Sequence, residues 1–136
     1  MQKRLQRYRQ KINFIAEKIG SISKKIDSPL ATDATLYRVQ TAIDAAMDLV
    51  AMLVKDNGLE VSDDYSNIKK LFNAKIIGEK LSEDLAMLNG LRNAIVHKYN
   101  SFEEETVLEN IDEITGVLED FLEKVENELK TIFKKN

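Results

Sequence analysis

The chain contains no cysteine, one histidine, one proline and five glycines in 136 residues. Without cysteine it can form no disulfide, offer no thiolate nucleophile and supply no cysteine ligand to zinc. A single histidine outside any HExxH pattern also argues against a dedicated transition-metal site. The shortage of proline and glycine favours long uninterrupted helices, because a many-stranded sheet needs such residues at its turns.

Long apolar runs are also missing, and no segment approaches the length of a membrane span. The first residues lack the charged-then-apolar pattern of a signal peptide, so we expect a cytoplasmic protein with no membrane association. Hydrophobic residues make up 43% of the chain and charged residues 32%, as in ordinary globular proteins. A chain of this length is expected to form one domain, residues 1–136, around one core.

Two antiparallel helices are predicted in the first half of the chain. The first spans residues 2–26, where apolar residues recur at alternating steps of three and four, and the only proline lies just beyond its end. The second begins near Thr32 or Asp33, either of which can cap it, and ends at the helix-stop pair Asn57-Gly58. Their similar lengths and short connection favour an antiparallel pair.

Three further helices are predicted in the second half. A short helix is capped within residues 62–64, and a longer one runs from about Ser82 to Tyr99. The last helix runs from Ser101 to about Lys134 and carries a wide apolar stripe. The predicted fold class is therefore all-α, an antiparallel up-down bundle of four long helices plus a short helix.

Charge is unevenly distributed along the chain. The formal net charge of -3 is not that of a general nucleic-acid binder, but residues 1–11 are basic while residues 103–128 are strongly acidic. Arg4, Arg7 and Lys11 line one edge of the first helix at helical spacing. This edge is either an ordinary solvated face or a strip that contacts RNA phosphates.

An arginine interrupts the apolar stripe of the helix that precedes Tyr99. Arg92 stands where the pattern requires an apolar residue, and an arginine without a partner is too costly to bury. Two outcomes are open. Either Arg92 pairs inside the fold with Asp44 or Asp48 of the second helix, or this face opens into a site or an interface.

The spacing of the polar residues around Arg92 suggests how they could cooperate. Asn93 and His97 are four residues apart and share a helix face, so the asparagine side chain could orient the imidazole. Arg92 and His97 are five residues apart, roughly 140° round a helix, and cannot easily close on one phosphate within a single helix. Two copies of the helix near a two-fold axis could do so, which favours a homodimer with a shared cleft.

An arginine and a histidine without a metal suit the cleavage of RNA by its own 2′-hydroxyl. The histidine can take or give a proton near neutral pH, and the arginine can hold and neutralise a phosphate. The product would be a 2′,3′-cyclic phosphate, and DNA would be inert because it lacks the hydroxyl. The alternative is structural, with Arg92 paired inside the fold and His97 favourably ending a helix.

The same segment fits a family motif. Arg92, His97 and Tyr99 match R-x4-H-x-Y, and the chain resembles HEPN-domain proteins of the HepT group. The likeness extends over residues 30–110. Residues 37–46 resemble the second helix of that group, residues 65–91 resemble its approach to the motif helix, and the first helix matches only by pattern.

The resemblance implies a helical-bundle toxin of a toxin–antitoxin pair, a metal-independent endoribonuclease that acts on RNA, such as tRNA, as a homodimer without a cofactor. It makes Arg92 and His97 catalytic, and the spacing and charge pairing described above add Asn93 and Asp44 as supporting residues. Tyr99 would receive AMP from ATP through a partner antitoxin, a minimal nucleotidyltransferase of the MNT type. An anionic adduct beside His97 would fill the cleft and repel RNA phosphates.

A second class of function stays open under the same resemblance. A HEPN bundle can serve as a nucleotide-binding or docking subunit of a minimal nucleotidyltransferase. Arg92 would then hold a nucleotide phosphate, and no RNA would be cleaved. A purely structural bundle is the third reading, in which Arg92 contributes only to stability.

Overall fold

The protein is all-helical in the computed structural model, which describes residues 2–22, 26–97 and 101–134, with only the backbone of residues 101–103. No strand occurs within these ranges. The helices are α1 (Gln2–Gly20), α2 (Pro29–Asp56), α3 (Asp64–Asn73), α4 (Glu79–His97), α5 (Ser101–Glu109) and α6 (Ile111–Ile132). The predicted all-α bundle with four long helices is confirmed, and α3 and α5 are the short ones.

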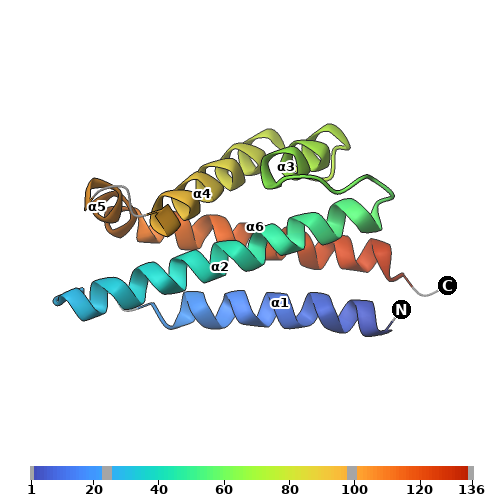
Figure 1. The fold of residues 1–136 in the computed structure, drawn as a ribbon. Helices are drawn as coiled ribbons and strands as arrows, with labels where there is room; N and C mark the ends of the chain where they lie inside the picture. The colour runs from blue at the N-terminus through green and yellow to red at the C-terminus, as the bar shows by residue number, and fades with distance from the viewer. Residues whose placement is uncertain (1, 23–25, 98–100, 135–136) are drawn as a thin grey trace.

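Helix α2 is the centre of the bundle, since it contacts each of the other five helices. Figure 1 shows α1 and α2 side by side and antiparallel, with α3 and α4 along the other side of α2. Helix α6 packs against α1, α2 and α4. The central position of α2 is reflected in its sequence, because its residues Ala42, Ala45 and Ala46 are buried and let neighbouring helices approach closely. None of the helices within the described ranges has the length and apolar character needed to cross a membrane.

Two helix ends in the first half differ from the prediction. Helix α1 ends at Gly20 rather than at residue 26, and the N–H of Ser21 closes its last turn on the carbonyls of Glu17 and Lys18. Glycine has a low helix propensity, which favours an end of the helix at Gly20. Helix α2 starts at Pro29 rather than near residue 32, because Ser28 caps it and its hydroxyl accepts a hydrogen bond from the N–H of Ala31.

The second half shows two more differences. Helix α4 begins at Glu79 instead of near Ser82. The predicted last helix is divided into α5 and α6, with Asn110 at the break. The Nδ2 of Asn110 donates to the carbonyl of Thr106 at 2.7 Å. An asparagine side chain that competes for a backbone carbonyl in this way favours a helix end over a helix interior.

Other helix ends follow the sequence closely. Asn57 is the C-cap of α2, and Gly58 has a φ of 77°, which is favourable for glycine. Asp63 caps α3, and its Oδ1 accepts a hydrogen bond from the N–H of Ser66 at 2.9 Å. That backbone N–H lowers the pKa of Asp63 because it stabilises the carboxylate.

A buried tyrosine ties the N-terminal end of α1 to the C-terminal end of α2. Tyr8 is fully buried, and its hydroxyl donates to Asp56 Oδ2 at 2.7 Å. Arg4 Nε donates to the same oxygen at 2.8 Å, and Phe133 packs edge-on against the Tyr8 ring. Burial and the hydrogen bond to Asp56 both raise the pKa of Tyr8. Because the folded state disfavours the tyrosinate, stability should be intact below about pH 10 and fall above it.

Asp56→Ala is expected to lower the free energy of unfolding by about 2–3 kcal/mol, because it leaves the buried Tyr8 hydroxyl without its charged acceptor. Urea unfolding monitored by circular dichroism measures the change. Glu126→Ala is the matched control, since Glu126 pairs with Arg9 where both side chains are nearly half exposed. The control should lose less than about 1 kcal/mol. Equal losses in the two variants would contradict the role given to Asp56.

Candidate active site

Arg92 lies on α4 with its guanidinium held at the surface of α2. Its Nε donates to Asp44 Oδ1 at 2.5 Å, and its Nη1 donates to the side-chain oxygen of Asn93 at 2.9 Å. Its Nη2 makes no hydrogen bond within the described part of the chain. The Arg92 side chain keeps 32% of its surface exposed, so its outer edge can receive an anion.

The sequence of α4 explains this placement. Leu85, Leu88 and Ile95 occupy the same apolar stripe as Arg92 and are buried against the core. The long arginine stem can follow this stripe while its charged end reaches the surface. The pairing with Asp44 and the partial exposure occur together, so Arg92 is both anchored in the fold and open to solvent.

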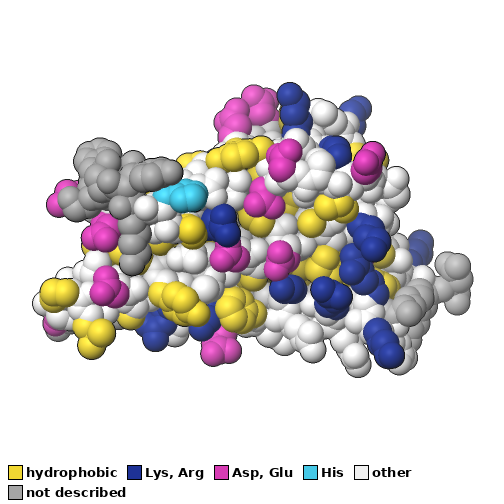
Figure 2. Space-filling view, in the orientation of Figure 1, with side chains coloured by type: hydrophobic (Ala, Val, Ile, Leu, Met, Phe, Trp, Pro, Cys, Tyr) yellow, Lys and Arg dark blue, Asp and Glu magenta, His cyan; other side chains and the backbone are white. Residues whose placement is uncertain are grey.

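His97 is the last residue of α4, and its side chain is exposed. Figure 2 shows this single histidine in cyan on a face that also carries basic and acidic side chains. His97 is five positions after Arg92 on the helix, a rise of ~7.5 Å. Tyr99 lies outside the described residues. The side-chain oxygen of Asn93 accepts a hydrogen bond from the guanidinium of Arg92, and its expected role in orienting the imidazole stays a prediction.

Carboxylates surround Arg92 more closely than the sequence indicated. Burial raises the pKa of Asp64 at the start of α3, the positive charge of Arg92 lowers it, and Asp48 and Asp44 raise it further. In the sequence Asp64 was identified only as part of a helix cap, since no spacing rule connects it to α4. The arginine therefore lies in an acidic environment that holds it firmly and limits how strongly it attracts distant phosphates.

The basic edge of α1 is largely neutralised by α2. Arg4 pairs with Asp56 at 2.8 Å, and Lys11 pairs with Asp48 Oδ2 at 2.7 Å. Arg7 is exposed on the same helix. Arg4 and Lys11 therefore hold α1 against α2, and a phosphate would have to compete with carboxylates for either of them.

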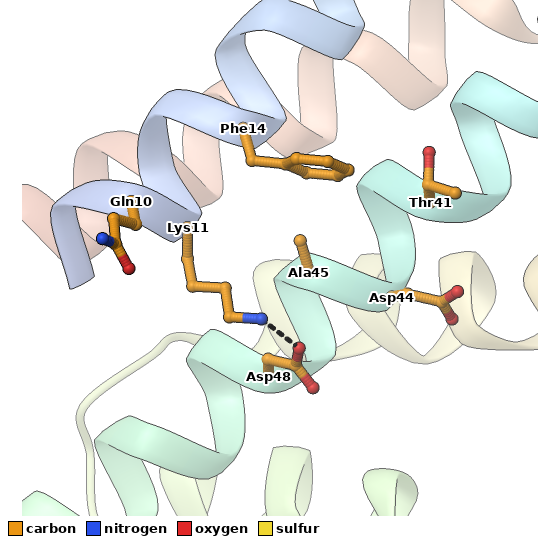
Figure 3. Close-up of a pocket in the computed structure, with 7 residues that line it drawn as sticks. All are labelled: Gln10, Lys11, Phe14, Thr41, Asp44, Ala45 and Asp48. Atoms are coloured by element: carbon orange, nitrogen blue, oxygen red, sulfur yellow. Dashed lines mark hydrogen bonds and ion pairs between the residues drawn. The ribbon is translucent and has the colours of Figure 1, made fainter. Parts of the chain in front are cut away.

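An open pocket of about 380 Å³ lies between α1 and α2, next to Asp44. Helix α1 contributes Gln10, Lys11 and Phe14 to its lining. Helix α2 contributes Thr41, Asp44, Ala45 and Asp48. Figure 3 shows the Phe14 ring extending from α1 toward α2, with the Lys11–Asp48 ion pair at one side. This pocket was not predicted, because it depends on how two helices pack.

The described residues include no group of three or more His, Cys, Asp or Glu side chains placed to hold a metal ion. The chemical groups that the site offers are therefore a fixed guanidinium, an exposed imidazole, several carboxylates and a neighbouring pocket. Together they could bind a phosphate and transfer a proton.

Comparisons with known proteins indicate one family. A family model described as "Ribonuclease HepT-like" matches residues 5–125. A protein of Archaeoglobus fulgidus named "Putative RNase" is 42% identical over 129 residues, which cover 95% of this chain and 98% of that protein.

Two solved structures share the fold. A crystal structure of a toxin–antitoxin with AMP-PNP superimposes with a TM-score of 0.80 at 19% identity, over 88% of this chain and 97% of that one. A tri-AMPylated Shewanella oneidensis HEPN toxin in complex with an MNT antitoxin gives a TM-score of 0.71 at 19% identity, over 92% of this chain and 95% of that one. At these identities the likeness is one of fold.

Proposed function

The chain belongs to the HepT-like ribonuclease family, and from this premise we propose that it is a metal-independent endoribonuclease with Arg92 and His97 as catalytic residues. One observation carries the proposal. Asp44 holds the Arg92 guanidinium through Nε, the Arg92 side chain keeps 32% of its surface exposed, and the exposed His97 follows on the same helix. This arrangement presents a phosphate-binding group and a proton-transfer group at the spacing of the R-x4-H motif.

The reaction proposed is attack of an RNA 2′-oxygen on the adjacent phosphorus. The bond from the 2′-oxygen to phosphorus forms, and the bond from phosphorus to the 5′-oxygen breaks. One His97 imidazole removes the 2′-hydroxyl proton, and a second, protonated His97 from the other copy in the proposed homodimer gives a proton to the departing 5′-oxygen. Arg92 neutralises the charge that develops on the non-bridging phosphate oxygens. The products are a 2′,3′-cyclic phosphate and a 5′-hydroxyl.

A homodimer is part of the proposal, because one helix separates Arg92 and His97 too widely to act on one phosphate. Exposed apolar side chains on α2 and α4 support it: Tyr37 is 61% exposed and Val96, beside His97, is 40% exposed. A second copy that covers them would bring two motif helices to a shared cleft. Sedimentation velocity should then give the mass of a dimer, and a monomer at micromolar concentration would contradict it.

Regulation by a partner is proposed from the relatives, one of which is an AMPylated HEPN toxin in complex with an MNT antitoxin. We place the corresponding modification at Tyr99, two residues after His97. An adenylate there would add negative charge and bulk beside the imidazole and exclude RNA phosphates. Intact mass before and after incubation with ATP and the cognate nucleotidyltransferase tests this, and Tyr99→Phe should show no added mass.

The ribonuclease proposal predicts cleavage that survives metal removal. Unmodified wild-type protein, verified by intact mass, is expected to cut total tRNA in EDTA and to leave cyclic phosphate ends. An oligonucleotide with deoxyribose at every position is the matched control, and it should stay intact because it lacks the attacking hydroxyl. End-group analysis by mass spectrometry measures the outcome. Cleavage that stops in EDTA, or 3′-hydroxyl products, would overturn the proposed mechanism.

The acidic surroundings of Arg92 favour one second candidate, a nucleotide-binding subunit of a nucleotidyltransferase. Asp44 and Asp64 reduce the attraction of this region for a long polyanion more than for a single nucleotide. This candidate predicts intact RNA in every sample and ATP binding that Arg92→Ala weakens. Calorimetric titration with ATP distinguishes it from the ribonuclease.

A further inference from the structure

The pocket between α1 and α2 has the size and shape of a binding site for one flat ring. Its volume of about 380 Å³ lies at the small end of ligand pockets in proteins. Phe14 is 38% exposed, and its ring extends over the pocket from α1 (Figure 3). The Lys18 ammonium lies 5.1 Å from the centroid of that ring. Ala45 on α2 gives the opposite side a small apolar surface, so a planar group could pack between the two.

The charges around the pocket suit an uncharged ligand that offers N–H donors. Asp48 is paired with Lys11 and Asp44 with Arg92, so the lining carboxylates are balanced and a phosphate has no cation to itself there. Each pairing uses one carboxylate oxygen, Asp48 Oδ2 and Asp44 Oδ1. The second oxygen of each makes no hydrogen bond within the described residues and can accept one from a ligand amino group.

The pocket is also directly connected to the proposed catalytic arginine. Asp44 lines the pocket and simultaneously accepts the hydrogen bond from Arg92 Nε. A phosphate on the outer edge of Arg92 would therefore lie one side chain away from the pocket. That separation is what an RNA chain requires, with its charged backbone on the arginine and a neighbouring base turned aside.

We propose that this pocket binds the base of one RNA nucleotide next to the cleaved phosphate, and that it selects bases with an exocyclic amino group. Phe14 stacks on the base, and the open oxygens of Asp44 and Asp48 accept its amino protons. Adenine, cytosine and guanine have such a group, whereas uracil has a carbonyl oxygen in its place and one ring N–H between two carbonyls, so it suits the carboxylates less well. Because this inference rests on the proposed ribonuclease function, it needs a readout by binding as well as one by cleavage.

Phe14→Ala tests the cleavage side of the proposal. Sequencing of the ends left on total tRNA should show that the wild type avoids uridine at one position flanking the cut. The variant should lose this bias, and its kcat/KM on substrates with a favoured base should fall about tenfold, as expected for the loss of one base–aromatic stack. Phe72→Ala is the matched control, because Phe72 is 37% exposed on α3 and lies outside the pocket. It should keep both the bias and the rate.

Binding is measured separately by adding AMP, CMP, GMP or UMP to isotope-labelled wild-type protein and recording amide chemical shifts. The three amino-bearing nucleotides should shift Gln10, Phe14 and Ala45, and UMP should shift them least. Shifts in a protein that leaves RNA intact would sustain the pocket and defeat the ribonuclease proposal. Cleavage with the same base bias in wild type and Phe14→Ala, or equal shifts from all four nucleotides, would overturn the proposal of base binding in this pocket and leave the ribonuclease proposal intact.

Discussion

His97→Ala is expected to reduce RNA cleavage by about 10²–10⁴-fold, the usual contribution of a positioned general acid or base. The imidazole is the only side chain of its kind in the chain, so no second histidine of the same protomer can replace it. Initial rates on total tRNA in EDTA measure the loss. The affinity of the variant for RNA should change little, because phosphate binding is assigned to Arg92, and fluorescence anisotropy with labelled RNA checks that separation.

The fold should tolerate this change, because the His97 side chain is exposed at the end of α4. Glu83→Ala is a suitable control, since Glu83 is an exposed residue on the same helix far from the motif. Both variants should melt within a few degrees of the wild type, and Glu83→Ala should cleave RNA at the wild-type rate. Full activity in His97→Ala would remove the histidine from the mechanism.

Local side-chain chemistry explains which helix ends could be predicted. Asn57-Gly58 favours a helix end and Asp63 favours a helix start, and the structure has both. Pro29 has two favourable roles, since a proline can end a preceding helix and can also fit the first turn of the next helix. Only the second role determines where α2 begins. Asn110 was not predicted as a break, because the apolar stripe continues through it and its own hydrogen bond decides the outcome.

In the candidate site, too, the features that depend on one helix could be predicted, and those that depend on helix packing could not. The out-of-pattern position of Arg92 predicted that it would either pair with α2 or lie on a face that opens into a site or an interface, and Asp44 was one of two named partners. Asp64 and the pocket could not be predicted, because they depend on where α1 and α3 pack against α2. The catalytic roles of Arg92 and His97 stay predictions, since they came from chemistry and family likeness.

Arg92→Lys is expected to reduce cleavage by about 10²–10³-fold although it keeps the positive charge, the loss seen when one donor to a developing anion is removed. A lysine has a single ammonium, which would be drawn to Asp44. It cannot bind that carboxylate through one nitrogen and present another to a phosphate, as a guanidinium can. Cleavage rates measured beside melting temperatures test this geometry directly.

Asp44→Asn separates positioning from direct catalysis at the same site. The amide oxygen can still accept the hydrogen bond from Arg92 Nε, but it no longer holds the guanidinium by charge, so the rate should fall about tenfold and less than in Arg92→Lys. Asp44→Ala removes the acceptor, so its cleavage rate should be lower still. If Arg92→Lys lowered the melting temperature and left cleavage unchanged, the Arg92–Asp44 pair would be a structural link between α4 and α2, and the phosphate-binding role would have to lie elsewhere.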